Sequence, residues 1–107
     1  MTVLKRAQIG KAAGIDTTVK SASGIWKAFA PTWDMVMGIK HGTLSEAEYR
    51  ARYAAILERV PAQVWDKLAE RDEAILLCYC RDGWFCHTHL IIDFAVRNWP
   101  DRFQDGR

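Results

Sequence analysis

The chain has 107 residues, of which 50% are hydrophobic and 26% are charged, a composition that supports one globular domain with one modest core. Its formal net charge of +2 is too small to indicate nucleic-acid binding by bulk attraction, and no apolar stretch approaches the roughly 20 residues that span a bilayer. Because three cysteines cannot all pair and Lys5 and Arg6 interrupt any leader pattern, we expect one cytoplasmic domain over residues 1–107, with reduced thiols.

Short strands are predicted near the start of the chain. Residues 2–9 suit a short strand or an extended arm, and the β-branched run at 15–20 is typical of a strand. The small polar residues at 21–24 then indicate a loop.

A helix is predicted over residues 31–41. Pro31 suits its first turn, where the missing N–H would be unpaired in any case, and Gly42 suits its end. The helix carries a stripe at helical spacing, formed by Trp33, Val36, Met37 and Lys40. We assign Trp33 to the core.

Two further helices are predicted between residues 45 and 70. Ser45 and Glu48 have the spacing of a capping box, in which each side chain bonds the backbone N–H of the other. Pro61 separates this helix from a second one, on which Trp65 is assigned to the core.

The last third of the chain predicts a strand, a helix and a polar tail. The apolar run at 73–80 is typical of a parallel strand that is buried on both faces. Residues 86–98 then suit a helix that stops at Trp99 and Pro100. The tail at 101–107 is too short and polar for a further strand.

This order of elements predicts an α/β fold: a small, mainly parallel sheet flanked by helices in a three-layer, Rossmann-like sandwich with right-handed crossovers. So small a sheet exposes an edge. Pairing across that edge, or burial of the last helix between subunits, predicts a homodimer or a higher homo-oligomer.

One segment carries most of the chemistry, since residues 76–90 hold all three cysteines and two of the three histidines. A strand ends at Cys80, a turn follows, and Cys86 opens the last helix. Ligands of α/β proteins bind outside the carboxyl ends of strands, so the segment marks the expected site. The helix start favours a thiolate at Cys86, and Cys86 and His89 share a helix face.

Three interpretations of these thiols stay open. Cys78, Cys80 and Cys86 with a histidine have the right atoms for tetrahedral zinc, although the spacing matches no closed zinc pattern. Alternatively, Cys86 is a nucleophile assisted by His87 or His89. In the third interpretation, Cys78 and Cys80 are small buried hydrophobes, and the helix start binds an anion through its backbone N–H groups.

A second polar cluster follows the strand predicted at 15–20, and parallel neighbouring strands would bring it close to the thiols. Lys20 is a candidate phosphate partner there, Asp16 a candidate acceptor for a hydroxyl or amine, and Arg81 a possible lid. Trp26 and Trp84 lie in predicted loops, from which an indole can stack on a ring.

Two motifs resemble the family of domains of unknown function 488 (DUF488), in its short bacterial and phage type. The front motif is 16–21 followed by 29–37, and the back motif is 76–80 with 85–87. The resemblance implies an α/β sandwich with both motifs side by side at one end of the sheet, and no settled activity. Many members have an arginine where Thr88 stands, and longer members continue into a further strand after the last helix.

We therefore expect a pocket for a small phosphate-bearing, nucleotide-derived ligand, with no metal or cofactor and no membrane or nucleic-acid partner. In a phage, such a pocket would sequester a host nucleotide immune signal. The alternatives are a cysteine-dependent enzyme with Cys86 as nucleophile and His87 as base, and a protein-binding inhibitor with an aromatic surface. The predicted ligand-binding residues are Asp16, Thr18, Lys20, Ser21, Trp26, Cys80, Arg81, Trp84, Cys86 and His87.

Overall fold

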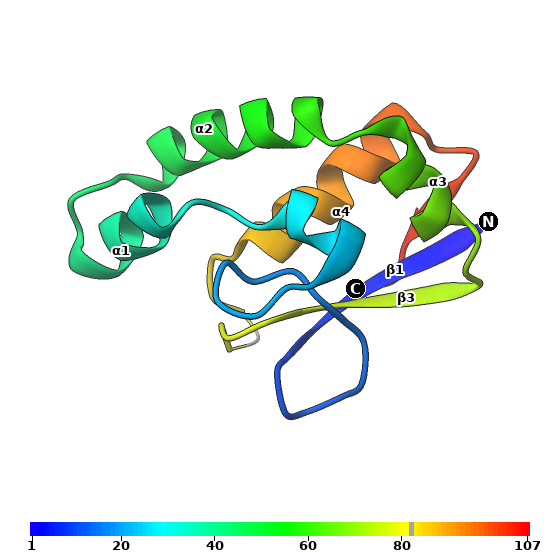
Figure 1. Ribbon diagram of the computed structural model, residues 1–107, viewed down its shortest axis with the longest axis horizontal. Coiled ribbons are helices and arrows are strands. Elements are labelled where there is room, and N and C mark those ends of the chain that lie inside the picture. Colours follow the sequence, from blue (N-terminus) through cyan, green and yellow to red (C-terminus); the bar gives the residue numbers. More distant parts are fainter. Residues whose placement is uncertain (82) are drawn as a thin grey trace.

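The computed structural model describes residues 1–81 and 83–107 and contains a four-stranded parallel sheet of order β2-β3-β1-β4 (Figure 1). The strands are β1 (Thr2–Gln8), β2 (Ile15–Asp16), β3 (Glu73–Cys78) and β4 (Phe103–Asp105). Strands β1 and β3 pair along almost their whole length, with Gln8 opposite Cys78. The α/β class and the parallel sheet are therefore confirmed.

Within the described residues, five helical segments connect or follow the strands: the 3-10 helix η1 (Gly24–Phe29), α1 (Trp33–His41), α2 (Glu46–Arg59), α3 (Ala62–Ala69) and α4 (His87–Asn98). The caps that the sequence predicts at the end of α1 and at the start of α2 are present in the structure. Gly42 ends α1 in the left-handed conformation, and the Ser45 hydroxyl accepts the Glu48 N–H at 3.1 Å before α2. Among the described residues, no helix combines the length and apolar character needed to cross a membrane.

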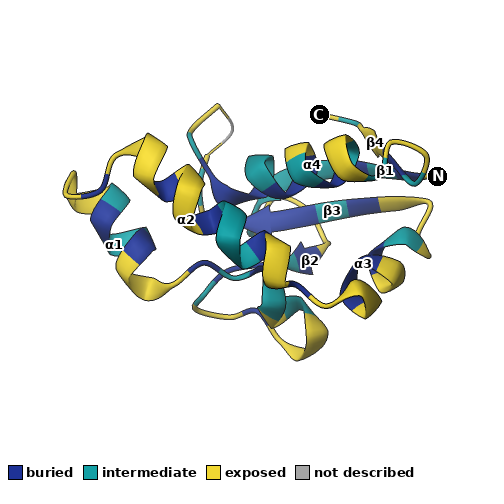
Figure 2. Ribbon diagram, turned by 90° about the horizontal axis from the view of Figure 1, so that it is seen from above, coloured by how far each residue is buried: buried dark blue, intermediate teal, exposed yellow. Residues whose placement is uncertain are grey.

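The helices lie on one face of the sheet, so the domain has two layers and not the three predicted (Figures 1 and 2). The β2-to-β3 and β3-to-β4 connections cross the sheet in the same direction, and right-handed crossovers therefore place their helices on the same face. The β1-to-β2 connection runs the other way and passes the opposite face as a loop. This loop lies close to β3, because a Cβ on Gly14 would overlap the carbonyl oxygen of Ile75.

The polar tail corrects a second prediction, because it forms a strand. Phe103 to Asp105 pair in parallel with Thr2 to Leu4 of β1. The Phe103 side chain is 1% exposed and contacts the rings of Trp65 and Trp99, so one apolar residue anchors an otherwise polar strand. The tail thus covers the β1 edge, which removes one reason for an oligomer; the oligomeric state itself stays a prediction.

The core lies between the sheet and the helices. Leu4, Leu76 and Tyr53 are fully buried there, and Trp65 is 2% exposed, as predicted. Strand β2 is shorter than predicted, because the chain turns after Asp16: the Asp16 carboxylate accepts the Thr18 N–H at 2.9 Å, as in an Asx turn. Trp33, by contrast, is 54% exposed and does not belong to the core.

Candidate functional site

A cavity of about 620 Å³ opens beyond the carboxyl ends of β1 and β3, at the start of α4. Helix α1 contributes its entire predicted stripe to the lining: Trp33, Val36, Met37 and Lys40. The segment between β3 and α4 and the turn after β2 contribute most of the remaining described residues. Ligands of α/β proteins bind at this end of a parallel sheet.

The two motifs singled out in the sequence meet at this cavity. The Thr17 hydroxyl donates to the Leu77 carbonyl at 3.0 Å, and the His87 ring contacts Thr17 through its hydroxyl and carbonyl oxygens at 2.8 and 3.0 Å. Ser21 Oγ lies 3.2 Å from the Tyr79 hydroxyl. Direct contacts therefore hold the turn after β2 against residues 76–90, the segment that holds the three cysteines.

Seven of the ten predicted ligand-binding residues line the cavity: Thr18, Lys20, Cys80, Arg81, Trp84, Cys86 and His87. The other three are engaged by the protein itself. Asp16 and Ser21 hydrogen-bond each other within the turn, and Trp26 stacks on Phe29 under the Arg71 guanidinium. Their roles in binding stay predictions.

The Asp16 carboxylate organises the turn that presents Lys20. Burial alone would raise its pKa, but hydrogen bonds from Ser21 and from the backbone and hydroxyl of Thr18 lower the pKa below its ordinary value. Asp16 is thus a charged acceptor whose oxygens already receive three hydrogen bonds from its own turn.

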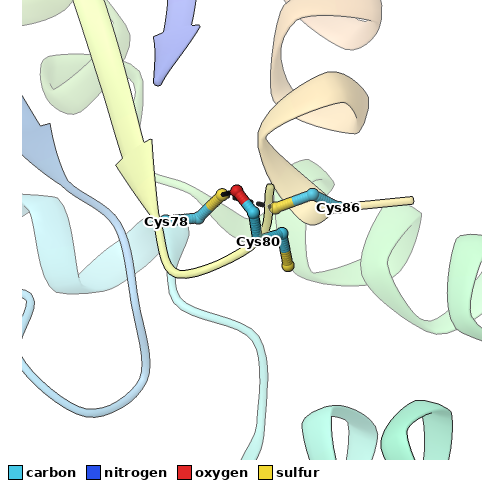
Figure 3. A group of neighbouring side chains, drawn as sticks. All are labelled: Cys78, Cys80 and Cys86. Atoms are coloured by element: carbon cyan, nitrogen blue, oxygen red, sulfur yellow. Dashed lines mark hydrogen bonds between the residues drawn. The ribbon is translucent and has the colours of Figure 1, made fainter. Parts of the chain in front are cut away.

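The three cysteines form a compact cluster, with their Sγ atoms all within 4.8 Å of one another (Figure 3). Cys78 ends β3, Cys80 lies in the following turn, and Cys86 directly precedes α4; the Cys86 thiol donates to Cys78 Sγ at 2.8 Å. Arg6, on β1, donates to Cys78 Sγ at 3.0 Å and to the Cys80 carbonyl at 2.8 Å. Cys78 and Cys86 are buried, and Cys80 is half-buried.

The cluster favours a thiolate at Cys78, whereas the sequence predicts one at Cys86. Hydrogen bonds from Cys80 and Cys86, with a further one from Arg6, lower the pKa of Cys78 despite its burial. The same hydrogen bond to Cys78 raises the pKa of Cys86, because it favours the protonated donor.

His87 is a neutral, buried imidazole. Because the Thr17 hydroxyl hydrogen is directed to Leu77, Nε2 of His87 carries the proton that bonds Thr17, and Nδ1 faces Cys86 Sγ at 3.7 Å. Burial lowers the pKa of His87 to about 4. His89 points elsewhere, with its Nδ1 3.0 Å from the Arg107 guanidinium.

Two contributors to this region were missed in the sequence. The first is the face of α1 that lines the cavity. The sequence predicts this face from the spacing of its residues, but the same spacing occurs in a face that packs against a core. Arg6 follows Leu4 by two residues on β1 and therefore points to the same face of the sheet, a pattern visible beforehand. Its Nε also donates to Thr88 Oγ1 at 3.2 Å, so β1 brings a guanidinium to Thr88.

Comparisons with known proteins identify the family alone. No curated protein and no solved structure matches the chain. A family model described as the active DUF488-N3 subclade, DUF488-N3a, matches residues 5–98, which begin within β1 and run to the end of α4. This confirms the resemblance seen in the two motifs: the chain belongs to the DUF488-N3a family.

Proposed function

We propose that the cavity binds a small, planar, phosphate-bearing ligand derived from a nucleotide. The observation that carries this proposal is the gathering of exposed aromatic rings and cationic side chains around one cavity. Each ring alone would be unremarkable on a protein surface, whereas a contiguous apolar patch with charged neighbours is typical of a binding site.

The aromatic part of the lining suits a base. Trp33, Tyr79 and Trp84 are 54%, 51% and 62% exposed, and all three line the cavity. A base stacked on such a ring gains about 1–3 kcal/mol, and the stacking tolerates different bases. The exposed rings therefore support recognition of a flat heterocycle without specifying which one.

The charged part of the lining suits an anion. Lys20, Lys40 and Arg81 line the cavity, and its described lining contains no carboxylate. The Arg81 guanidinium lies 5.7 Å from the Trp84 ring centre, so one group that could stack and one that could bind phosphate are already adjacent. The start of α4 adds the positive end of a helix dipole.

Calorimetric titration with the four ribonucleoside monophosphates tests the proposal, with the matching nucleosides and ribose phosphate as controls that lack one half of the ligand. We expect at least one monophosphate to bind and both controls to bind more weakly. Lys20→Ala should weaken binding roughly tenfold to hundredfold, the scale of a charge-assisted hydrogen bond, whereas Lys27→Ala on η1 should not.

Trp84→Ala should also weaken binding, because it removes an exposed stacking surface. Trp26→Phe is its control, since Trp26 packs on Phe29. The proposal fails if no monophosphate binds with a Kd below about 1 mM, or if Lys20→Ala and Lys27→Ala bind equally well. If nucleotides bind without being turned over, sequestration of a nucleotide signal by a phage is the role we propose.

A cysteine-dependent enzyme is the second candidate, and the hydrogen bonds at Cys78 favour it. They stabilise a thiolate on a side chain that lines the cavity, so Cys78 replaces Cys86 as the candidate nucleophile. Under this alternative, Cys78→Ser abolishes turnover of the bound nucleotide and leaves its affinity within about tenfold. Protein-binding inhibition, the third expectation, stays a prediction.

A further inference from the structure

We infer that Cys78, Cys80 and Cys86 form a binding site for a thiophilic metal ion, namely zinc(II), with the fourth coordination position open to the cavity. This inference does not rest on the proposed nucleotide ligand. It rests on the cluster geometry, on the access that the cavity provides, and on the groups around the sulfur atoms.

The sulfur atoms are close to the separation that zinc requires. With zinc–sulfur bonds of about 2.3 Å, two thiolates of a tetrahedral site lie about 3.8 Å apart. The three Sγ atoms all lie within 4.8 Å of one another, and the 2.8 Å separation between Cys78 and Cys86 needs to widen by about 1 Å. Cys80 lies in a turn, where its side chain can adjust by rotation.

The cluster also has an entry path and an open side. All three cysteines line the cavity, so an ion can reach them from solvent. Catalytic zinc sites use three protein ligands and leave the fourth position to water or a bound substrate, whereas structural sites use four protein ligands. The spacing fits no four-ligand pattern, which is consistent with a three-cysteine site of this open kind.

The surroundings suit metal-bound thiolates. Three thiolates and one zinc(II) ion carry a net charge of −1, and the Arg6 guanidinium donates a hydrogen bond to Cys78 Sγ at 3.0 Å. Hydrogen bonds of this kind from outside the ligand set orient the ligands and tune the metal.

The test uses the reduced, metal-free protein, titrated under nitrogen with zinc against a chromophoric chelator and, separately, with cobalt(II). We expect one ion per chain, release of protons, and a cobalt spectrum with thiolate charge-transfer bands and the strong visible absorption of tetrahedral geometry. Cys80→Ser and Cys86→Ser should each lower zinc affinity by at least about a hundredfold, since even an indirect partner of a zinc ligand costs tenfold to a hundredfold.

The matched control is His89→Ala, because His89 lies on the same helix but bonds Arg107. Its zinc affinity should equal that of the unmodified chain. Because Cys80 is only half-buried, Cys80→Ser keeps the test valid even if Cys86→Ser fails to fold, as circular dichroism will show. Less than one tightly bound ion per chain, or unchanged affinity in Cys80→Ser, would overturn the inference.

Discussion

Single buried polar contacts tie the helical layer together, and the Tyr53 hydroxyl is the clearest example. Tyr53, on α2, is fully buried and donates to the backbone carbonyl of Phe29 at 2.5 Å. The bond joins α2 to the end of η1, next to the wall of the cavity that α1 forms.

Removal of this hydroxyl should be costly. Tyr53→Phe leaves the Phe29 carbonyl buried without its partner, which costs about 1–3 kcal/mol of unfolding free energy. Urea unfolding monitored by circular dichroism measures the change. The control is Tyr79→Phe. The Tyr79 hydroxyl contacts Ser21 at the surface, so its removal should change the unfolding free energy by less than about 0.5 kcal/mol. Equal effects in the two variants would contradict the assignment.

Individual residues also show what the sequence could not predict about the site. The thiols and Lys20 were correctly placed at one end of the sheet, because strand ends and turns are visible locally. Trp33 was assigned to the core, yet it is exposed at the cavity, whereas Trp26 packs on Phe29 and its role in binding stays a prediction. Which side of a short helix faces the core depends on tertiary packing, and the spacing of its apolar residues does not contain that information.

At the scale of elements, the capping box of α2 makes the second prediction. Ser45→Ala removes the oxygen that accepts the Glu48 N–H and should destabilise the protein by about 0.5–2 kcal/mol in urea unfolding. Ser23 occupies the equivalent position before η1 but its side chain makes no capping bond, so Ser23→Ala is a matched control with little effect. A larger loss in Ser23→Ala than in Ser45→Ala would refute the role of the cap.

Strand β4 makes the third prediction, through pH. Side-chain and backbone hydrogen bonds with Arg107 lower the pKa of Asp105 to about 2, from 3.8. A depressed carboxyl pKa stabilises the folded state above the ordinary value, and this contribution disappears as the pH falls from about 4 to about 2. Asp105→Asn should therefore lose less unfolding free energy than the unmodified chain across this interval.

Urea unfolding at several pH values on either side of that interval measures the difference. Asp101→Asn, at an exposed carboxylate before β4, is the control and should follow the unmodified chain. Parallel pH profiles for the unmodified chain and Asp105→Asn would exclude Asp105 as a source of acid sensitivity.

Local signals explain which elements were predictable. The helices begin and end at caps, prolines and glycines that are visible in the sequence, and β3 carries an apolar run. Strand β4 has only one buried apolar residue, Phe103, and forms because the β1 edge is available to it. Such a strand is a product of tertiary pairing, and its composition alone argued against it.

The whole molecule has one core, which makes the fourth prediction. The Trp65 ring, on α3, contacts rings from η1, α4 and β4 as well as Trp99, so elements from both halves of the chain share its surroundings. We expect two-state unfolding, with superimposable urea curves from tryptophan fluorescence and far-ultraviolet circular dichroism. Separate midpoints for the two probes would contradict two-state unfolding.

The placement of every helix on one face also follows from topology at this scale. The sequence predicted the order of β1, β2, α1, α2, α3, β3 and α4, but the layer count depends on the order of strands in the sheet. That order arises from pairings between segments about seventy residues apart, such as Val3 with Glu73. Once it is known, the handedness of crossovers determines which face the helices cover.

The order of the strands in the sheet has a consequence for amide hydrogen exchange. The central strands β1 and β3 have partners on both sides, whereas β2 and β4 are short and lie at the margins. Deuterium should therefore enter β2 and β4 first and the middle of β3 last, near Leu76 and Leu77, where both neighbours pair. The slowest-exchanging backbone of the molecule would then lead directly into the cysteine cluster.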